Sequence, residues 1–172
     1  IFTYNDWKTL SVWIMDRDGT NPRQVSELAW DPVWSPDGSR VLFAGGQSSR
    51  PQLFTANPDG SQRFQVTDLD RLRGRSDWSI NGLIATYQGS PWNRQVVVIQ
   101  PDGSGYREVS PPGGNSQGPS FSPDGRWIAF TGYYGKIGDL QGCDIYIMRT
   151  DGSDLRQLTN NDYCDWQPRW GR

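Results

Sequence analysis

A repeated Asp-Gly pair constrains this chain more than any other feature of its sequence. The glycines of the pair return at intervals of 41, 43 and 49 residues. Self-similarity at a period of roughly 40 to 50 residues is typical of stacked supersecondary units such as propeller blades. Runs rich in Val, Ile and Phe flank each pair, which predicts a β-hairpin there, since glycine accepts a positive φ at little cost. The four pairs are Asp18-Gly19, Asp59-Gly60, Asp102-Gly103 and Asp151-Gly152.

A second repeated string predicts another hairpin in each unit. The sequence reads WSPDG at residues 34–38, WSING at 78–82 and FSPDG at 121–125. Proline presets the backbone for a turn and glycine closes it, while an aromatic residue precedes the turn and an apolar run follows it. Each unit is therefore expected to contain four strands that are joined in order by short turns.

These units predict an all-β chain folded as a β-propeller of four blades, each with four antiparallel strands. Three blades are expected at about residues 31–70, 71–113 and 114–165, and a fourth combines 1–30 with 166–172. In that fourth blade the C-terminal strand would pair with the N-terminal strands and close the ring. Closure is favoured because open sheets leave unpaired edges and leave aromatic blade faces in water. An arc of a larger propeller and a dimer that forms a larger ring are the alternatives.

Charge and composition exclude several classes of function. The 172 residues carry a net charge of −2 and include no histidine. The charge supplies no basic face for nucleic acid, and the missing histidine removes Ser-His-Asp, Cys-His and most zinc chemistry. No apolar run approaches the roughly 18 residues that a membrane span requires. The chain begins at Ile1 and shows no leader, so we expect a processed protein or an excised domain.

The repeated strings resemble the TolB-type, WD-like β-propeller repeat. The resemblance rests on PVWSPDGSRVLFAGG with LFTANPDGSQRFQVT, and on PSFSPDGRWIAFTG with DIYIMRTDGSDLRQLT, and it extends over essentially the whole chain. It implies a β-propeller of a usually bacterial and often exported kind, which also occurs as an accessory domain beside peptidases and other enzymes. The resemblance implies the blade and not a particular activity, because one fold serves many functions.

Candidate binding residues lie in the irregular connections, which a propeller gathers on one face. The opposite face carries the short S-P-D-G and Asp-Gly turns and is expected to be structural. Aromatic and arginine side chains on variable loops are typical of binding hot spots. Trp30 and Trp166 are expected to cap blades, whereas Trp7, Trp92 and the pair Tyr133–Tyr134 are expected to be exposed anchors. The predicted ligand-binding residues are Trp7, Arg50, Trp92, Arg94, Tyr133, Tyr134, Tyr163 and Trp166.

Cys143 and Cys164 are the two cysteines of the chain, and both fall in connections of the irregular face. A disulfide between them is sterically reasonable, and a bridge across 21 residues would stabilise the fold by ~3 kcal/mol. Such a bridge would fit a periplasmic or extracellular location, where oxidising conditions prevail. Two unpaired buried thiols are the alternative.

No cofactor is expected for this chain. Asp16, Asp18 and Glu27 are spaced faintly like a calcium loop. The glycine of that motif is misplaced, however, and the segment crosses a predicted hairpin, so a structural turn is the preferred interpretation. Calcium bound near Asp162 and Asp165 is left open.

The sequence predicts a non-catalytic binding module that recognises a protein or peptide through its irregular loops. Spacing brings no nucleophile and base together, and the variable loops are rich in aromatic residues. A carbohydrate-binding propeller is the alternative, because Trp and Tyr beside Asp, Asn and Arg can stack on a sugar and hydrogen-bond it. An accessory propeller of a larger secreted enzyme or receptor is also left open, as is a glycoside hydrolase built on an acidic pair. The sequence leaves monomer and homodimer undecided.

Overall fold

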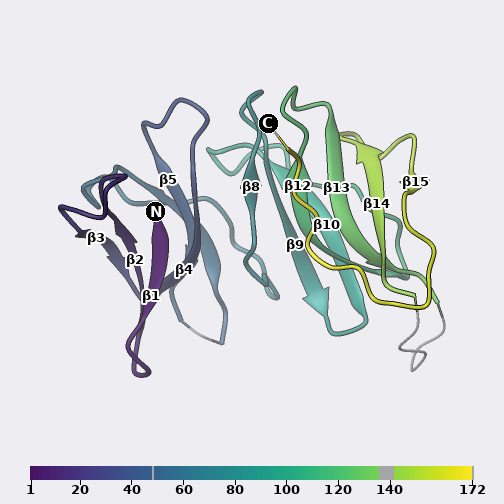
Figure 1. Cartoon of the computed structure of the whole chain (residues 1–172), viewed down its shortest axis with the longest axis horizontal. Helices are drawn as coiled ribbons and strands as arrows, with labels where there is room; N and C mark the ends of the chain where they lie inside the picture. Colours follow the sequence, from purple (N-terminus) through teal and green to yellow (C-terminus); the bar gives the residue numbers. More distant parts are fainter. Residues whose placement is uncertain (48, 136–141, 172) are drawn as a thin grey trace.

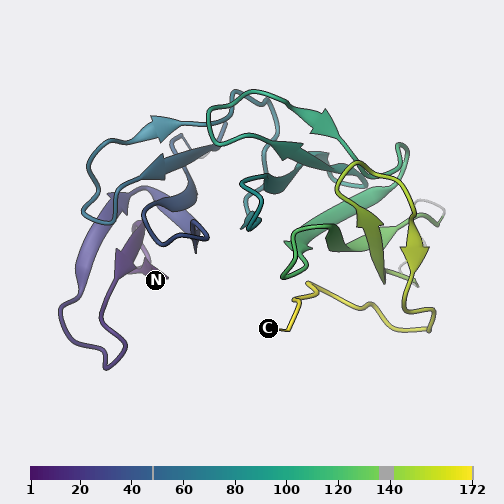
Figure 2. The ribbon, with the colours of Figure 1, turned by 90° about the horizontal axis from the view of Figure 1, so that it is seen from above.

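The chain folds into a row of β-sheet blades that are arranged as an arch (Figure 1, Figure 2). The computed structural model describes residues 1–47, 49–135 and 142–171. In these residues there are fifteen β-strands and no helix. The all-β propeller architecture expected from the repeats is therefore present, and the short turns between strands fall where the repeated strings place them.

One four-stranded blade shows how the sequence produces this architecture. Its second strand is buried along its whole length, although successive side chains of a strand point to opposite faces. Val41 and Phe43 enter one apolar core, which contains residues of the preceding blade. Leu42 and Ala44 enter another core, which contains residues of the following blade. The strands of this blade are β4 (Ala29–Trp34), β5 (Val41–Gly45), β6 (Gln52–Ala56) and β7 (Phe64–Gln65).

Two further four-stranded blades follow, and they share one continuous sheet. They meet where β10 and β12 form a single parallel bridge between Arg94 and Asn115. The third blade contains β8 (Asp77–Trp78), β9 (Ile84–Ser90), β10 (Asn93–Ile99) and β11 (Arg107–Glu108). The fourth blade contains β12 (Asn115–Phe121), β13 (Trp127–Tyr133), β14 (Asp144–Arg149) and β15 (Arg156–Gln157).

The glycine of each Asp-Gly pair has a packing role as well as a conformational one. In the three later blades a Cβ on this glycine would lie 2.5 to 2.8 Å from a valine carbonyl oxygen of the preceding blade. The close pairs are Gly60 with Val25, Gly103 with Val66 and Gly152 with Val109. Gly19 of the first blade has a similar φ of +86°, but an added Cβ there would meet nothing within 4 Å. The repeat is thus explained by a positive φ together with a close approach between neighbouring blades.

The predicted closure of the ring by the two termini is wrong in this structure. The first blade has three strands, β1 (Phe2–Asn5), β2 (Leu10–Ile14) and β3 (Arg23–Glu27), and β1 pairs with β2 alone among the described strands. The C-terminal segment forms no strand and lies across the opening of the arch from the N-terminus (Figure 2). Its hydrogen bonds go to the fourth blade instead, through Gln167 to Thr131 of β13 and through Trp170 to Ser120 of β12. The structure therefore has one three-stranded blade and three four-stranded blades in an open arch, and not four equal blades in a closed ring.

Candidate functional site

Antiparallel blades have two ends, and the two ends of these blades differ in chemistry. The turn face carries the S-P-D-G turns between first and second strands and the Asp-Gly turns between third and fourth strands. The loop face carries the connections between second and third strands and those that lead to the next blade. All eight predicted ligand-binding residues lie on or next to the loop face, but the structure brings only some of them together.

A pocket of about 180 Å³ opens on the loop face between the third and fourth blades. Aromatic rings, two carboxamides and the disulfide surround it. It unites Trp92, Tyr133 and Trp166, three of the predicted residues, with both cysteines. The lining residues are Trp92, Asn115, Gln117, Thr131, Tyr133, Cys143, Cys164 and Trp166.

Trp92 reaches this pocket from a tight turn between β9 and β10. Ser90 and Asn93 pair across the hairpin, so Pro91 and Trp92 form its tip. Trp92 has a φ of 69°, a conformation that costs a bulky L-residue free energy and that glycine usually occupies. Its indole stands edge-on to the ring of Tyr133, with centroids 5.9 Å apart, and 44% of the residue is exposed. Backbone strain at an exposed aromatic residue is more common at functional sites than elsewhere.

Trp166 is held over the pocket by bonds on both sides of it in the chain. Before it, Cys164 forms a disulfide with Cys143, with Cα atoms 4.5 Å apart, and the N–H of Asp165 donates to the carbonyl of Cys143 at 2.7 Å. After it, the N–H of Gln167 donates to Oγ1 of Thr131 at 2.9 Å. Trp166 was expected to cap its blade, but it is 58% exposed. The disulfide and the flanking hydrogen bonds therefore display this indole instead of burying it.

Trp30 occupies the corresponding position after the first blade and shows what a capping tryptophan looks like. The N–H of the next residue, Asp31, donates to Oγ1 of Thr3 at 3.1 Å, as Gln167 does to Thr131. Trp30 is half-buried and packs against an apolar core, and an added Cβ on Gly74 would lie 3.1 Å from its Nε1. The loop at Gly74 thus covers Trp30, which explains the different exposure of the two residues.

Two carboxamides are among the residues that line the pocket, and one buried atom of Asn115 has no hydrogen-bond partner. Asn115 is 7% exposed, and its buried Oδ1 has no hydrogen-bond partner. Arg94 donates from Nη1 to Oε1 of Gln117 at 2.7 Å, while the buried Nε of Arg94 has no partner. A guanidinium group only donates, so this bond turns the amide oxygen of Gln117 toward Arg94 and leaves its Nε2 able to donate elsewhere.

Two of the predicted anchors are less exposed than expected. Tyr133 is 7% exposed, so it is a wall of the pocket and not a projecting anchor. Tyr134 is half-buried, its hydroxyl is 2.8 Å from Oγ of Ser116, and its ring packs edge-on against Tyr146. Burial raises the pKa of Tyr134 to about 12. Tyr134 supports the fourth blade and does not line the pocket. Tyr133 is the last residue of β13 and Tyr134 follows it, and successive residues of an extended chain point to opposite faces, so one of the two is expected to turn away from the site.

The remaining predicted residues lie on the loop face outside the pocket. Trp7 is 95% exposed at the tip of the β1–β2 hairpin, and its φ of 69° equals that of Trp92. Arg50 forms exposed ion pairs with Asp68 at 2.9 Å and Asp70 at 3.2 Å. Tyr163 is exposed in the C-terminal segment. The structure therefore spreads these side chains along the arch and gathers none of them with the pocket residues.

Three of the five carboxylates considered for calcium, those of Asp16, Asp18 and Asp165, accept hydrogen bonds from nearby side chains. Within the described ranges, no three Asp, Glu or Cys side chains gather where they could hold a metal ion. The carboxylate of Asp18 accepts from the hydroxyl of Thr20 at 2.7 Å, and this bond and the backbone N–H of Thr20 lower its pKa. Asp16 accepts from Asn21 at 2.8 Å, and Asp165 accepts from Asn161 at 2.9 Å.

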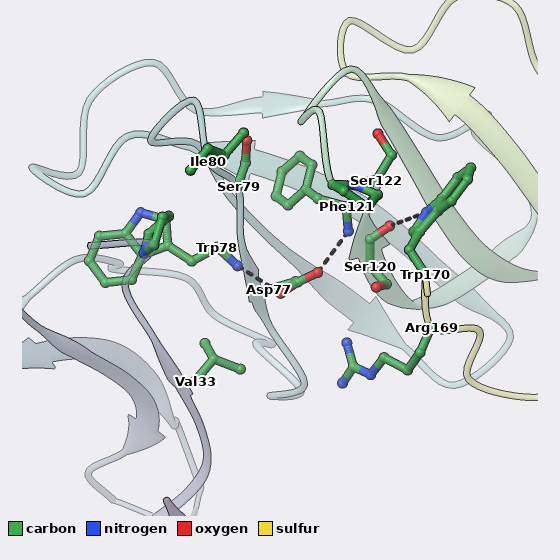
Figure 3. Close-up of a pocket in the computed structure, with 12 residues that line it drawn as sticks. Val33, Asp77, Trp78, Ser79, Ile80, Ser120, Phe121, Ser122, Arg169 and Trp170 are labelled. Atoms are coloured by element: carbon green, nitrogen blue, oxygen red, sulfur yellow. Dashed lines mark hydrogen bonds between the residues drawn. The ribbon is translucent and has the colours of Figure 1, made fainter. Parts of the chain in front are cut away.

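A larger hollow of about 620 Å³ lies on the inner side of the arch, and sequence reasoning missed it (Figure 3). Val33 of β4, Trp78 of β8, Phe121 of β12 and Trp170 of the C-terminal segment line it. A signal for it exists in the sequence, because an aromatic residue precedes each S-P-D-G-type turn at one register. Two of these aromatic residues, Trp78 and Phe121, line the hollow, whereas in the second blade Val33 lines it and Trp34 does not.

Several polar groups of the inner hollow form structural hydrogen bonds. Asp77 accepts from the N–H of Trp78 at 3.0 Å through Oδ1 and from the N–H of Phe121 at 2.7 Å through Oδ2, and the second of these bonds ties β8 to β12 (Figure 3). The indole N–H of Trp170 donates to the carbonyl of Ser120 at 3.1 Å. By contrast, two of the three unpartnered buried side-chain atoms in the described chain are Asn115 Oδ1 of the loop-face pocket and Arg94 Nε beside it. The loop-face pocket is therefore the stronger candidate site.

Sequence reasoning also missed the polar residues of the pocket itself. Residues 111–118 read as a loop in the sequence, whereas the structure includes Asn115 and Gln117 in β12. The alternation of polar residues in NSQ was the available signal, since residues two apart in a strand share a face.

A family model and several known proteins match this chain. The model for the TolB beta propeller domain matches residues 1–172. The Tol-Pal system protein TolB of Bordetella pertussis is 31% identical over 152 residues, which cover 85% of this chain and 33% of that protein. An uncharacterized protein of Agrobacterium fabrum is 42% identical over 190 residues, which cover 84% of this chain and 63% of that protein.

Similarity to solved structures agrees with the sequence matches at the level of the fold. The crystal structure of TolB from Acinetobacter baumannii superposes with a TM-score of 0.74 at 18% identity, covering 94% of this chain and 40% of that one. The chain spans about a third of the length of the Bordetella pertussis relative. Within the residues that the structure describes, no helix is long and apolar enough to cross a membrane.

Proposed function

Because the chain belongs to the TolB β-propeller domain family, we propose that it is a non-catalytic binding module that recognises a protein or peptide through its loop face. The observation that carries this proposal is the loop-face pocket of about 180 Å³, which Trp92, Tyr133 and Trp166 line together. Exposed aromatic side chains around a small, largely desolvated pocket are typical of interface hot spots. The pocket is the anchoring point of the proposed surface.

The chemistry of the pocket favours binding over catalysis. Its lining contains no carboxylate, no cationic side chain and no free thiol, because both cysteines are in the disulfide. General acid–base and nucleophilic catalysis use such groups most often, and the hydroxyls of Thr131 and Tyr133 have no carboxylate, lysine or histidine among the lining residues to activate them. The pocket therefore offers shape, apolar surface and neutral hydrogen bonds to a ligand, and its volume suits one inserted side chain.

The arrangement of the rings favours a peptide side chain over a sugar. A pyranose binds best on a broad, open aromatic face. Here the rings of Trp92 and Tyr133 meet at 67° and form adjoining walls instead of one platform. A carbohydrate ligand remains the second candidate because Asn115 and Gln117 could hydrogen-bond sugar hydroxyls.

The wider loop face supplies further proposed contacts. Trp7, Arg50 and Tyr163 are exposed outside the pocket. We expect them to contact outer parts of a bound protein. The disulfide supports a periplasmic or extracellular location, since such bonds persist in oxidising compartments.

Peptide selection tests the proposed function directly. A random peptide library displayed on phage is selected against the immobilised full chain, and enriched peptides are synthesised and titrated. We expect peptides that bind the unmodified chain and lose at least tenfold in affinity with Trp92→Ala and with Trp166→Ala.

Trp34→Ala is the matched control for these variants. Trp34 has a similar exposure but lies at the turn-face end of β4 and lines neither the loop-face pocket nor the inner hollow. The proposal predicts unchanged affinity for this variant, with folding of all three variants verified by circular dichroism. Failure to enrich any peptide, or equal loss with Trp34→Ala, would overturn the proposed function. A glycan array with specific hits at the pocket would replace it with the carbohydrate-binding alternative.

A further inference from the structure

We propose that the unpaired edge of β1 binds an extended segment of a partner protein, which adds to the first blade as its first strand. The segment carries the pattern Trp-x-Pro-x-Trp that residues 30–34 and 166–170 share. β1 does not line the loop-face pocket, so the inference goes beyond the proposed function. Three observations carry it: an unprotected strand edge, a place that a first strand fills in the other blades, and the backbone of the C-terminal segment.

The edge of β1 is open and carries none of the usual protections against strand pairing. Among the described strands, β1 pairs with β2 alone. Its residues, Phe2–Asn5, include no charge and no proline, and its ladder with β2 contains no bulge. The outer edge strands are short or charged, since β7, β11 and β15 have two residues each and β3 carries Arg23 and Glu27. An open edge of this kind is a template for strand addition.

In each later blade a first strand covers the edge that is open in β1. The strands β4, β8 and β12 pair with the second strands β5, β9 and β13. Trp13 and Phe54 lie at the same distance before their Asp-Gly pairs, and they pair with Phe2 and Phe43. Phe2 of β1 therefore corresponds to Phe43 of β5, and the strand that the described first blade lacks is the counterpart of β4.

The C-terminal segment shows which sequence takes the shape of a first strand. Residues 166–170 read WQPRW, and residues 30–34 of β4 read WDPVW. Three places before the last aromatic residue of each such string is a residue with a φ between 45° and 62°, namely Asp31, Arg75, Gly118 and Gln167. The N–H groups of Asp31 and Gln167 also donate to corresponding threonines of the preceding blade. The pattern Trp-x-Pro-x-Trp is therefore compatible with the backbone that the open edge requires.

The register of the second blade predicts how the added segment pairs. In that blade Trp30 lies opposite Ala44, which corresponds to Thr3 of β1. The first tryptophan of the segment is therefore expected opposite Thr3, and the residue before it opposite Tyr4. The N–H of Gly46 donates at 3.2 Å to the residue that precedes β4, and alternate residues of a strand turn their N–H and C=O to the same edge. The backbone of Thr3 accordingly faces the open edge and can exchange two hydrogen bonds with the segment.

A free segment of a partner is preferred over the chain's own C-terminus and over a second copy. Gln167 and Trp170 hold the C-terminal segment on the fourth blade, across the opening from the N-terminus (Figure 2). In a second copy the same bonds would bring all of its blades along with the segment, and these blades would have to enter the same opening. A segment of a partner brings only one strand.

A synthetic peptide tests the edge directly. The probe is N-acetyl-DWQPRWG-amide, which has the sequence of residues 165–171, titrated into the ¹⁵N-labelled full chain. We expect saturable NMR shifts of the amides of Thr3, Tyr4 and Asn5. A probe with an N-methyl group on its first tryptophan loses one bond to Thr3 and should bind about fivefold more weakly. Equal affinities for the two probes, or no shifts in β1, would overturn the inference.

A charge pair tests the predicted register. Tyr4 is 51% exposed, so Tyr4→Glu should fold, and its carboxylate would lie opposite the aspartate of the probe. Like charges directly opposite each other destabilise a strand pair, so binding should weaken about threefold, and the variant probe KWQPRWG should bind this variant about threefold more tightly than the unmodified chain. Leu155→Glu is the matched control, because it adds the same charge at an exposed position of the fourth blade. Equal effects of the two substitutions would contradict the register.

Trp92→Ala separates this inference from the proposed function, because the tryptophans of the probe could also enter the loop-face pocket. We expect unchanged affinity of the probe for this variant. A probe that loses affinity with Trp92→Ala and shifts the pocket residues would overturn the inference and leave the proposed function standing. Binding at β1, with no phage-selected peptide that depends on Trp92, would do the reverse. Concentration-dependent dimers that the probe dissociates would assign the edge to a second copy and overturn the partner segment.

Discussion

The turn face and the loop face of this chain are built from the same strands, but the turn face repeats one arrangement of hydrogen bonds and the loop face does not. On the turn face one local design recurs. In it, an aspartate accepts hydrogen bonds from a Ser, Thr or Arg two residues later, as Asp59 does from the N–H and hydroxyl of Ser61 at 2.9 and 2.6 Å. Asp37 and Asp124 of the S-P-D-G turns accept in addition from Ser35 and Ser122. These bonds pair the polar groups of each turn with one another.

The loop face contains the features that the repeat does not explain. It includes Trp7 and Trp92, both bulky residues at positive φ, the disulfide, and Asn115 with its unpartnered oxygen. Such features cost stability or need covalent support, and none of them recurs at the same place in every blade. The comparison teaches that the repeated positions maintain the fold, whereas the positions that differ between blades are where a specific function can be located.

The largest expected effect on stability comes from a substitution on the turn face. Gly60→Ala would place a Cβ 2.6 Å from the carbonyl oxygen of Val25 at a φ of +81°, so strain and overpacking together should cost about 4 kcal/mol of the free energy of unfolding. Gly19→Ala is the matched control, because its φ is similar and its surroundings are open; it should cost only about 1 kcal/mol. Urea denaturation measures both. Equal losses would show that the contact between blades does not matter.

The next effect concerns the covalent support of the loop face. Replacing both cysteines, Cys143→Ser with Cys164→Ser, should lower the free energy of unfolding by ~3 kcal/mol and release Trp166 from the pocket. Peptide affinity should fall at least tenfold, because one wall of the pocket is lost. Denaturation and titration of the double variant measure the two effects separately. A double variant with unchanged affinity would mean that the disulfide does not shape the pocket.

A smaller effect on stability is expected at the turn between β9 and β10, where Trp92 has a positive φ. Trp92→Gly and Trp92→Ala both remove the indole, and they differ only in how well the new residue accepts a φ of 69°. We expect the glycine variant to be more stable than the alanine variant by about 1 kcal/mol, the reverse of the usual order in strands. Thermal unfolding at equal concentrations provides the test. If alanine is the more stable residue here, the turn is not strained in solution.

The smallest expected effect is a difference in pH dependence between stability, which depends on the turn face, and peptide affinity, which depends on the loop face. The hydroxyl of Ser35 and the N–H of Ser39 lower the pKa of Asp37 to about 2, below its unfolded value. A lowered folded pKa means that the stabilisation is present above the unfolded pKa, near 4, and is lost as the pH falls through about 2. The melting temperature should therefore decline gradually below pH 4. Peptide affinity should stay constant from pH 5 to 8, because no carboxylate or histidine lines the pocket.

Much of the fold could be predicted from the sequence, because the turn chemistry is local and repeated. Asp-Gly and S-P-D-G encode their own conformations, so the strands between them and the assignment of loops to one face follow. The open arch could not be predicted, because closure depends on whether the C-terminal segment prefers β1 or the Thr131 and Ser120 partners it has. Asn115 was missed for a similar reason, since a missing hydrogen bond becomes visible only when all neighbours are placed.

The indole N–H signals of the nine tryptophans provide the most direct test of the account. Tryptophans lie in the loop-face pocket (Trp92, Trp166), in the inner hollow (Trp78, Trp170) and at the turn-face end of β4 (Trp34). A ¹⁵N-labelled sample titrated with a selected peptide should show shifts of Trp92 and Trp166, with Trp34, Trp78 and Trp170 unchanged. Shifts of Trp78 and Trp170 without shifts of Trp92 and Trp166 would place the binding site in the inner hollow. That result would contradict the claim that the loop face binds the partner.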